Sequence, residues 1–453
     1  MSFNKVLIAN RGEIAIRIIE ACHELGLGTV AVYSQPDREQ LHVELADESY
    51  CIGPKEPAES YLNLPALIGA ADISGADAIH PGYGFLAENA HFAEVCEGHG
   101  IHFIGPPSSI LELAGDKIQA KKMAEEAGVN VLPGSLEPIQ DQGVLQEEAK
   151  RLGPPLIIKA AMGGGGRGMR VVEDLEQLED AFRASKREAR ISFDDESVYL
   201  EKLLEKPKHI EVQLMADEEG NCTHLGEREC STQRRHQKLI EEAPAPNLSS
   251  PSRQEIREAA IKVARAIGYK SLGTVEFLVD EKENYYFIEL NARIQVEHPV
   301  SEEILGINMI KDQLQLAQGD RLRAEKYKDF RGHAIECRIN AEDPSRGFTP
   351  SAGKIKLKQL PGGNGVRFDS WIKDGAQVLP YYDSLLGKLI VHGEDRPEAI
   401  MKAVSSLRRF QLEGVRTTKD LLIDLLRDPD FRSGQYTIDF IEEFMRKGEF
   451  SRV

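Results

Sequence analysis

The chain has 453 residues, too many for a single hydrophobic core, so two to four domains are expected. Charged residues make up 29% and hydrophobic residues 41%, which is typical of globular proteins and excludes a disordered or fibrous chain. The net charge of -18 opposes contact with nucleic acid or anionic membranes, and no apolar stretch approaches the roughly 18 residues of a membrane helix. We therefore expect neither partner.

The six cysteines show no CxxC pair and no Cys/His spacing typical of zinc sites. They are Cys22, Cys51, Cys96, Cys222, Cys230 and Cys337. The first residues run from Met1 directly into an apolar, strand-like segment without a signal-like region. These features predict free thiols and a cytoplasmic protein.

The N-terminal part alternates strand and helix. Residues 5–10 form an apolar run, 12–25 repeat apolar side chains at helical spacing, and 29–34 are strand-like again. Further strands are expected at 77–80 and 102–104, so this domain, ending near residue 113, contains a parallel sheet. The first turn has only Gly12 where a dinucleotide fingerprint needs three glycines, which argues against an NAD site.

The middle of the chain predicts antiparallel hairpins with intervening helices. A helix is expected over 116–127 with Asp116 as N-cap, and another over 252–267. Three hairpins are expected, from 156–160 with 169–172, from 209–217 with 222–230, and within 274–291. Beyond residue 331 we expect strands at 334–339, 354–357 and 388–391, a helix at 397–410, and frayed ends over 445–453.

The third hairpin carries the strongest chemical signal. If Asp280 pairs with Tyr285, Glu276 lies directly opposite Glu289, with the two carboxylates about 5 Å apart. Such a pair needs a cation between its members, and Mg²⁺ with oxygen ligands suits it, with Asn291 as a third candidate ligand. The alternative is an edge hairpin with solvated acids, but apolar residues on both faces favour a covered sheet.

Period-two alternation would extend the face of Glu289 to Arg293, Gln295 and Glu297. A guanidinium fork and an amide suit a small planar oxyanion, and Glu297 could act as general base. The alternative is a surface charge ladder.

Three further segments carry weaker signals. The glycine run within 159–169 could approach phosphates or swing as a loop, or it could be only a flexible hairpin tip. Residues 201–204 could present backbone groups to an adenine, although an ordinary strand end explains them better. The basic segment 233–238 predicts either a site for an anionic small molecule or a solvated face, because the net charge disfavours nucleic acid.

Seven motifs together resemble the biotin carboxylase family over essentially the whole chain. They are ANRGEIAIR (9–17), HPGYGFLAEN (80–89), KAAMGGGGRGMRVV (159–172), STQRRHQK (231–238), FIELNARIQVEHPV (287–300), IECRINAEDP (335–344) and YYDSLLGKLI (381–390). Small departures from the family pattern occur at Ala161-Met162, Leu290, Ala292 and Ser301, and none removes a functional side chain.

The resemblance implies an α/β and α+β fold with three domains. These are a Rossmann-like domain (1–113), an ATP-grasp domain (114–331) whose lid subdomain (about 131–203) carries a mobile glycine-rich lid, and a mixed β C-terminal domain (332–445), followed by a tail (446–453). It also implies ATP- and bicarbonate-dependent carboxylation of biotin through carboxyphosphate, with ATP and two Mg²⁺ or Mn²⁺ ions as cofactors.

The resemblance assigns roles to individual residues. ATP-binding residues would be Lys117, Lys159, Gly164, Gly165, Gly166, Met169, Glu201, Lys202, Leu204, His209, Gln233, His236, Glu276, Leu278 and Glu289. Metal ligands would be Glu276, Glu289 and Asn291. Bicarbonate would be bound by Arg293, Gln295, the Val296 backbone and Lys238, and biotin by Arg338 and Tyr83. The catalytic residues would be Glu297, Arg338, Lys238 and Arg293.

The partners are also implied by the resemblance. The chain lacks a biotin-attachment motif, because Met401-Lys402 lies in a helical run. We therefore expect biotin on a separate biotin carboxyl carrier protein, a separate carboxyltransferase subunit, and a homodimer. One such system is acetyl-CoA carboxylase of fatty acid biosynthesis, and the final acceptor stays open. The alternatives are another ATP-grasp ligase, such as a carboxylate–amine ligase, and a non-catalytic nucleotide-binding regulator.

Overall fold

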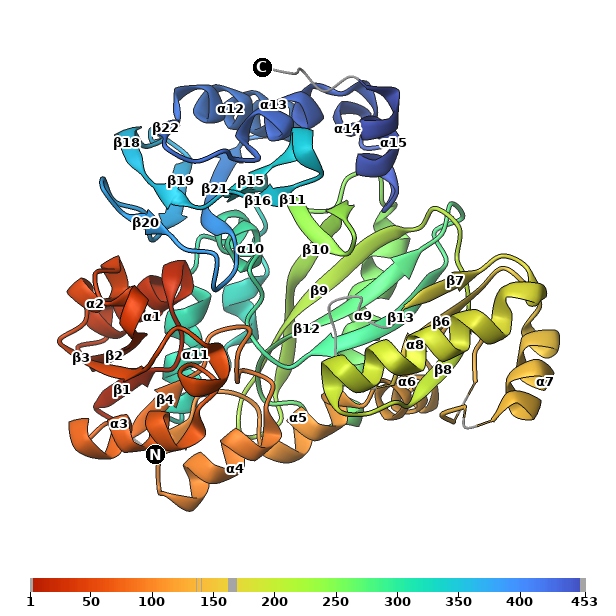
Figure 1. Cartoon of the computed structure of the whole chain (residues 1–453), viewed down its shortest axis with the longest axis horizontal. Helices are drawn as coiled ribbons and strands as arrows, with labels where there is room; N and C mark the ends of the chain where they lie inside the picture. The colour runs from red at the N-terminus through yellow and green to blue at the C-terminus, as the bar shows by residue number, and fades with distance from the viewer. Residues whose placement is uncertain (1–2, 136, 140, 162–168, 449–453) are drawn as a thin grey trace.

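The computed structural model describes residues 3–135, 137–139, 141–161 and 169–448 (Figure 1). The N-terminal part is a five-stranded sheet of order β3-β2-β1-β4-β5 in which every described pairing is parallel, as expected. Its elements are β1 (Lys5–Ile8), α1 (Gly12–Glu24), β2 (Gly28–Ser34), α2 (Leu41–Leu45), β3 (Glu48–Gly53), α3 (Leu64–Ser74), β4 (Ala78–His80), α4 (Ala90–Gly98) and β5 (His102–Phe103).

The first strand is shorter than predicted. The buried Asn10 side chain donates to the carbonyls of Pro81 and Tyr83, both at 2.7 Å, so the chain leaves the sheet before α1 begins. Arg11, in the same turn, forms a buried bidentate pair with Asp37 at 2.6 and 2.9 Å. A structural ion pair therefore occupies the turn in which a dinucleotide fingerprint would require glycines.

Helix α5 (Ser108–Gly115) leads into α6 (Lys117–Glu126). The predicted N-cap is confirmed, because the Asp116 carboxylate accepts from the backbone N–H groups of Ile118 and Gln119, both at 3.0 Å. This cap fixes the first turn of α6, in which Lys117 lies, and so sets the direction of the lysine.

A small antiparallel sheet of order β7-β6-β8 lies beside the main body, at the right of Figure 1. Its elements are α7 (Gln142–Leu152), β6 (Leu156–Ala160), β7 (Arg170–Val172), α8 (Leu178–Phe193) and β8 (Val198–Lys202). Leu156 pairs with Val172, which confirms the first predicted hairpin. The predicted glycine lid, with Gly164, Gly165 and Gly166, lies outside the described residues.

An eight-stranded antiparallel sheet of order β13-β12-β9-β10-β11-β14-β21-β19 forms the centre of the molecule. Its strands are β9 (Lys208–Ala216), β10 (Cys222–Arg234), β11 (Gln237–Ala243), β12 (Ser271–Val279), β13 (Tyr285–Asn291), β14 (His333–Asn340), β19 (Val366–Ser370) and β21 (Leu385–Gly393). Helix α9 (Ser250–Ala266) packs against β9, β10 and β12. Because β14 pairs with β11, strands of the third region continue the central sheet.

Most of the remaining elements lie around this continuation, whereas α11 (Met309–Ala317) packs against α1 and β12. The others are α10 (His298–Leu305), β15 (Glu342–Asp343), β16 (Thr349–Pro350), β17 (Gly353–Lys354), β18 (Lys356–Gln359), β20 (Gln377–Val378), α12 (Arg396–Arg409), β22 (Gln411–Glu413), α13 (Lys419–Arg427), α14 (Pro429–Ser433) and α15 (Phe440–Lys447). In Figure 1, α12 to α15 lie along the top of the molecule.

Two predictions for this region are wrong. The single strand expected at 354–357 is two short strands, because β17 pairs with β20 whereas β18 pairs with β22. The expected tail begins too early, because Arg446 and Lys447 belong to α15, whose Phe440, Ile441 and Phe444 are buried in the core.

All six cysteines are unpaired. Among the described residues, no helix has the length and apolar character needed to cross a bilayer.

Candidate active site

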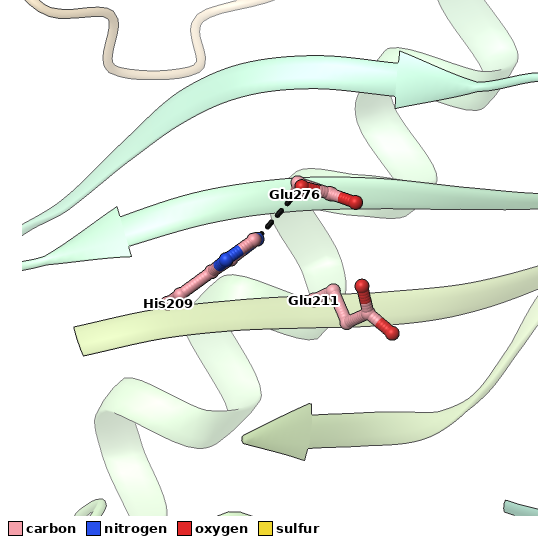
Figure 2. A group of neighbouring side chains, drawn as sticks. All are labelled: His209, Glu211 and Glu276. Carbon is pink, nitrogen blue, oxygen red and sulfur yellow. Dashed lines mark hydrogen bonds and ion pairs between the residues drawn. The ribbon is translucent and has the colours of Figure 1, made fainter. Parts of the chain in front are cut away.

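Three glutamates stand side by side across the central sheet. Glu276 of β12 pairs with Glu211 of β9 on one side and with Glu289 of β13 on the other. Figure 2 shows the carboxylates of Glu211 and Glu276 on neighbouring strands, with the His209 ring reaching Glu276. On the far side of Glu211, the fully buried Arg228 of β10 forms an ion pair with it at 2.5 Å. Positive groups must balance such a row of acids, because Glu211 and Glu276 are buried.

The predicted pairing of Glu276 with Glu289 is confirmed, but the strand register that produces it differs from the predicted register. Tyr285 pairs with Val279 and not with Asp280, so the hairpin leaves its turn one residue out of the predicted register. A register shift between the Glu276 and Phe277 pairs makes Ile288 an additional residue in β13. This β-bulge brings Glu289 opposite Glu276.

Glu276 lies in a dense set of donors. His209 Nε2 is 2.7 Å from its Oε2, while its Oε1 accepts from Asn291 Nδ2 at 2.9 Å and Gln295 Nε2 at 3.1 Å. Lys238 Nζ lies 3.3 Å from Oε1. Burial opposes ionisation, but Lys238 and His209 outweigh it and hold the pKa of Glu276 far below its usual range.

Glu289 is more open and forms an ion pair with Lys117, with Nζ 3.1 Å from Oε2. The two opposed carboxylates are hard oxygen donors of the kind Mg²⁺ prefers, so Glu276 and Glu289 fit a divalent cation. Asn291 fits less well, because its Nδ2 donates to Glu276 and its Oδ1 accepts from Arg293 at 3.1 Å.

A second acidic group is a poorer metal site. Ligand atoms of His209, Glu211 and Glu276 lie within 4.8 Å of one another. However, Lys238 Nζ lies 2.7 Å from Glu211 and 3.3 Å from Glu276. An ammonium group therefore already lies between these two acids and would repel a metal ion, so the Glu276–Glu289 pair is the better cation site.

The expected continuation of the strand through Arg293, Gln295 and Glu297 is wrong. Strand β13 ends at Asn291, and the following residues form a loop in which Ile294 is buried and Glu297 is the N-cap of α10. Pro299 in the first turn of α10 favours this helix start. The loop still directs Gln295 toward Glu276 and Arg293 toward Gln295 Oε1, at 3.0 Å.

Glu297 lies between two cations from different strands. Lys238 Nζ of β11 is 2.5 Å from its Oε1, and Arg338 Nη2 of β14 is 2.8 Å from its Oε2. Burial is outweighed by Lys238 and Arg338, which hold the pKa of Glu297 well below its usual range. Glu297 is therefore ionised and can accept a proton once a substrate disturbs these ion pairs.

Arg293 is held by a residue of the N-terminal domain that sequence reasoning did not select. Glu88 Oε2 accepts from Arg293 Nε at 2.9 Å, and Glu88 Oε1 accepts from the Ala292 N–H at 3.2 Å. Glu88 lies within the motif HPGYGFLAEN, so the family motif could have indicated Glu88 as a site residue. The motif does not indicate that Arg293 is its partner.

The part of the site facing the small sheet is lined by lysines. Lys159 and Lys121 both form ion pairs with Glu201, and Lys121 Nζ lies 2.8 Å from Glu201 Oε1. The Glu201 side chain is therefore buried between two cations and does not line the cavity, which leaves its backbone groups for the predicted contact with an adenine. Lys202 Nζ donates to the carbonyls of Gly153 and Pro154, each at 2.8 Å.

The basic segment 233–238 is the tip of the β10–β11 hairpin. Arg235 and His236 have φ of 48° and 64°, the left-handed conformation of a tight turn. Gln233 and Lys238 pair across the strands, and Gln233 Nε2 lies 3.1 Å from His209 Nδ1. The turn thus brings an amide and an ammonium group to the acid row.

Tyr83 and Val296 connect the site to a buried lysine. Tyr83 OH donates to Glu13, and Glu13 Oε1 lies 3.0 Å from Lys388 Nζ. Lys388 also donates to the Val296 carbonyl at 2.8 Å. The Val296 carbonyl is therefore already bonded within the protein.

A cavity of about 2120 Å³ is lined by most of the residues predicted for the site. Every described residue predicted for the site lines it except Glu201, namely Tyr83, Lys117, Lys159, Met169, Lys202, Leu204, His209, Gln233, His236, Lys238, Glu276, Leu278, Glu289, Asn291, Arg293, Gln295, Val296, Glu297 and Arg338. The residues missed are Glu211 and Glu88. Glu211 could have been found, since it shares a face with His209 by strand alternation.

Comparison with known proteins agrees with this geometry. Family profiles match "Biotin carboxylase, N-terminal domain" at residues 2–111, "Carbamoyl-phosphate synthase L chain, ATP binding domain" at 116–325, and "Biotin carboxylase C-terminal domain" at 336–443. A biotin carboxylase of Pseudomonas aeruginosa is 51% identical over 441 residues, covering 97% of this chain and 98% of the relative. A pyruvate carboxylase subunit of Methanothermobacter thermautotrophicus is 48% identical over 445 residues, covering 98% of this chain and 90% of the relative.

A solved structure is equally similar. The biotin carboxylase domain dimer of Hydrogenobacter thermophilus 2-oxoglutarate carboxylase, in complex with MgADP, ADP and bicarbonate, superposes with a TM-score of 0.96 at 47% identity and covers 100% of both chains. A fold of this kind, with a cavity that joins lysines, opposed acids and a glutamate held by two cations, defines an ATP-grasp ligase. The chain belongs to the biotin carboxylase family.

Proposed function

We propose that this protein uses ATP and bicarbonate to carboxylate biotin carried by a separate protein, through carboxyphosphate. The observation that carries the proposal is the placement of Glu297 between Lys238 and Arg338, on the same cavity wall as the opposed acids Glu276 and Glu289. Full-length similarity to biotin carboxylases favours this reaction over a carboxylate–amine ligase or a non-catalytic regulator.

In this proposal the nucleotide lies between the small sheet and the central sheet. Lys117 and Lys159 would bind its phosphates together with the glycine run, and His209, Gln233 and His236 would line the ribose and phosphate region. Met169, Lys202, Leu204 and Leu278 would border the adenine, since all four line the same cavity. Because the Glu201 side chain is ion-paired to Lys121 and Lys159, its proposed role is to position Lys159.

Glu276 and Glu289 would hold Mg²⁺ or Mn²⁺, with Asn291 at the edge of the site. Bound there, the cations would neutralise charge on the nucleotide phosphates during phosphoryl transfer. Lys117 and Lys238 now balance these carboxylates, so they are placed to move onto phosphate and bicarbonate oxygens when nucleotide binds.

Bicarbonate would lie against Arg293, Gln295, the Val296 backbone and Lys238. Glu297 would take its proton, and the carbonate oxygen would attack the γ-phosphorus of ATP to give carboxyphosphate and ADP. Carboxyphosphate would then break to CO₂ and phosphate, and the phosphate would take the proton of the biotin ureido nitrogen that attacks CO₂. Arg338 would stabilise the negative charge on the ureido oxygen, with Tyr83 near that pocket.

The relatives support the proposal that this chain works within a multisubunit carboxylase. These relatives include a biotin carboxylase, one component of a pyruvate carboxylase and a dimeric 2-oxoglutarate carboxylase domain, all of similar identity, so the acceptor is not set by this chain. We propose a cytoplasmic homodimer that works with a biotin carboxyl carrier protein and a carboxyltransferase subunit. The proposed domain limits are 1–113 and 114–331, and the third domain begins at residue 332 and includes all of α15.

The test is ADP formation with Mg²⁺, with and without bicarbonate and free biotin. The proposal expects ADP formation to require bicarbonate and to be stimulated by biotin, with ¹⁴C from bicarbonate recovered on biotin. Stimulation by an amine and not by biotin, or ADP formation without bicarbonate, would reject it. Co-purification of a biotinylated protein would identify the carrier.

A further inference from the structure

Behind Arg338, away from the cavity, two carboxylates face each other inside the protein. Glu241 of β11 and Glu336 of β14 are direct partners in the antiparallel ladder, and neither has any exposed surface. Directly opposed residues of such strands have Cα atoms about 4.5–5.5 Å apart, so the two carboxyl groups can touch.

The geometry of β14 and β11 places this pair on the same strand faces as Arg338 and Lys238, which line the cavity. Glu336 and Arg338 share a face of β14 by alternation. On β11, Thr232 pairs with Ile240 whereas Gln233 pairs with Lys238, so Leu239 is an additional residue. This bulge brings Lys238 and Glu241 onto one face despite their odd spacing.

The pair has too few donors for two carboxylates. Among the described residues, no hydrogen-bond donor reaches either carboxylate oxygen of Glu336, whereas Glu241 Oε1 forms an ion pair with Arg338 Nη2. Two facing buried carboxylates that share a single charged donor are strongly disfavoured unless a proton joins them.

Nearby positive charge is insufficient to ionise both acids. The charged groups that face them are Arg338, Lys388, Lys238 and Glu297. Lys388 is shared with Glu13 and the Val296 carbonyl, while Lys238 and Arg338 are shared with Glu297. The other titratable neighbours are the buried thiols of Cys230 and Cys337.

We propose that Glu241 and Glu336 share one proton, which resides mainly on Glu336, and that the charged Glu241 carboxylate acts as a positioning residue that holds Arg338 from behind. Burial raises the pKa of both groups, and that of Glu336 lies well above its ordinary value. Glu241 is the partner in contact with Arg338, which favours its ionised form.

The charged Glu241 contributes to catalysis if Arg338 binds biotin, and this part of the inference rests on the proposed function. Arg338 is shared between Glu297 in front and Glu241 behind. When Glu297 accepts the bicarbonate proton, it loses its charge and its hold on Arg338. Glu241 then keeps the guanidinium in place and aligned for the ureido oxygen.

Two isosteric variants give opposite expectations. Glu241→Gln removes the carboxylate behind Arg338, and we expect the kcat of biotin carboxylation to fall about 10- to 100-fold, while the KM values for ATP and bicarbonate change less than about twofold. Glu336→Gln keeps a neutral partner, and we expect at least about half of the wild-type rate because the uncharged form is already the resident one. Equal losses in both variants would reject the asymmetric pair.

The protonation itself has readouts that need no activity. At neutral pH the infrared spectrum of the wild type should contain the carbonyl band of a buried protonated carboxyl group, which Glu336→Gln removes. Because the folded state keeps a proton that the unfolded state releases, wild-type stability should decline as pH rises above the unfolded-state pKa of Glu, about 4.3, and Glu336→Gln should decline less.

The outcomes separate this inference from the proposed function. A missing infrared band, or identical pH dependence of the Tm in wild type and Glu336→Gln, would overturn the shared proton whatever the enzyme's activity. If the wild type fails to carboxylate biotin while both signals are present, the proposed function fails and the buried acid pair stands. Should Glu241→Gln not fold, the Glu336→Gln measurements decide alone.

Discussion

Glu276 and Glu289 face each other across β12 and β13 because Ile288 is an additional residue in β13. Without this bulge, the register set at the Asp280 turn would pair Glu276 with Ile288 and direct Glu289 to the other face of the sheet. The bulge therefore places two acids on the cavity wall. Bulges that direct a side chain in this way recur beside active sites.

Magnesium dependence tests this acid pair. Glu289→Gln should raise the Mg²⁺ concentration needed for half-maximal ADP formation at least about tenfold, since one hard oxygen ligand becomes a neutral amide. Glu126→Gln, at an exposed position of α6, is the matched control and should behave as the wild type. An unchanged Mg²⁺ dependence in Glu289→Gln would place the metal elsewhere.

Glu297→Gln tests the general base. The amide cannot accept the bicarbonate proton, so kcat for bicarbonate-dependent ADP formation should fall about 10²- to 10⁴-fold, with little change in the KM for ATP. Glu325→Gln, an exposed substitution, serves as the control, and the Tm of both variants should be measured. A loss below about tenfold in a folded variant would argue against the role of Glu297.

Arg338→Gln separates the two halves of the proposed reaction. Biotin-stimulated turnover should fall about 100-fold, because the ureido oxygen loses its positive partner. Bicarbonate-dependent ADP formation without biotin should fall much less, because Lys238 still contacts Glu297. An equal loss of both rates would mean that Arg338 acts through Glu297 and not on biotin.

The stability of the C-terminal region should depend on Glu242. Its buried carboxylate binds His333 at 2.6 Å, Arg396 at 2.6 and 2.8 Å, and the Tyr436 hydroxyl. Burial is outweighed by His333 and Arg396, which lower the pKa of Glu242 to about 2. Because Arg396 would be left unpaired, Glu242→Gln should lower the free energy of unfolding at pH 7 by about 3–5 kcal/mol.

The pH dependence of that loss follows from the lowered pKa. The stabilisation is complete above the unfolded-state pKa of Glu, about 4.3, and is lost as pH falls toward the folded-state value. Denaturant unfolding of wild type and Glu242→Gln should therefore differ most near neutral pH and converge in acid. A constant difference down to about pH 3 would contradict the linkage.

Local sequence patterns determined the elements that depend on neighbouring residues. The alternation in the third hairpin, the βαβ unit at the N-terminus and the Asp116 cap were all readable, because strand alternation, helix period and capping act within a few residues. The family motifs likewise selected the residues that line the cavity, although not their contacts.

Tertiary structure alone decided how these pieces meet. Glu297 comes from a loop before α10, Lys238 from β11 and Arg338 from β14, and only the strand order of the central sheet brings them together. The bulge at Ile288, the burial of Glu201 between two lysines and the contact of Glu88 with Arg293 were equally unreadable. Register and long-range contacts depend on the packing of the whole core, which no short segment of sequence contains.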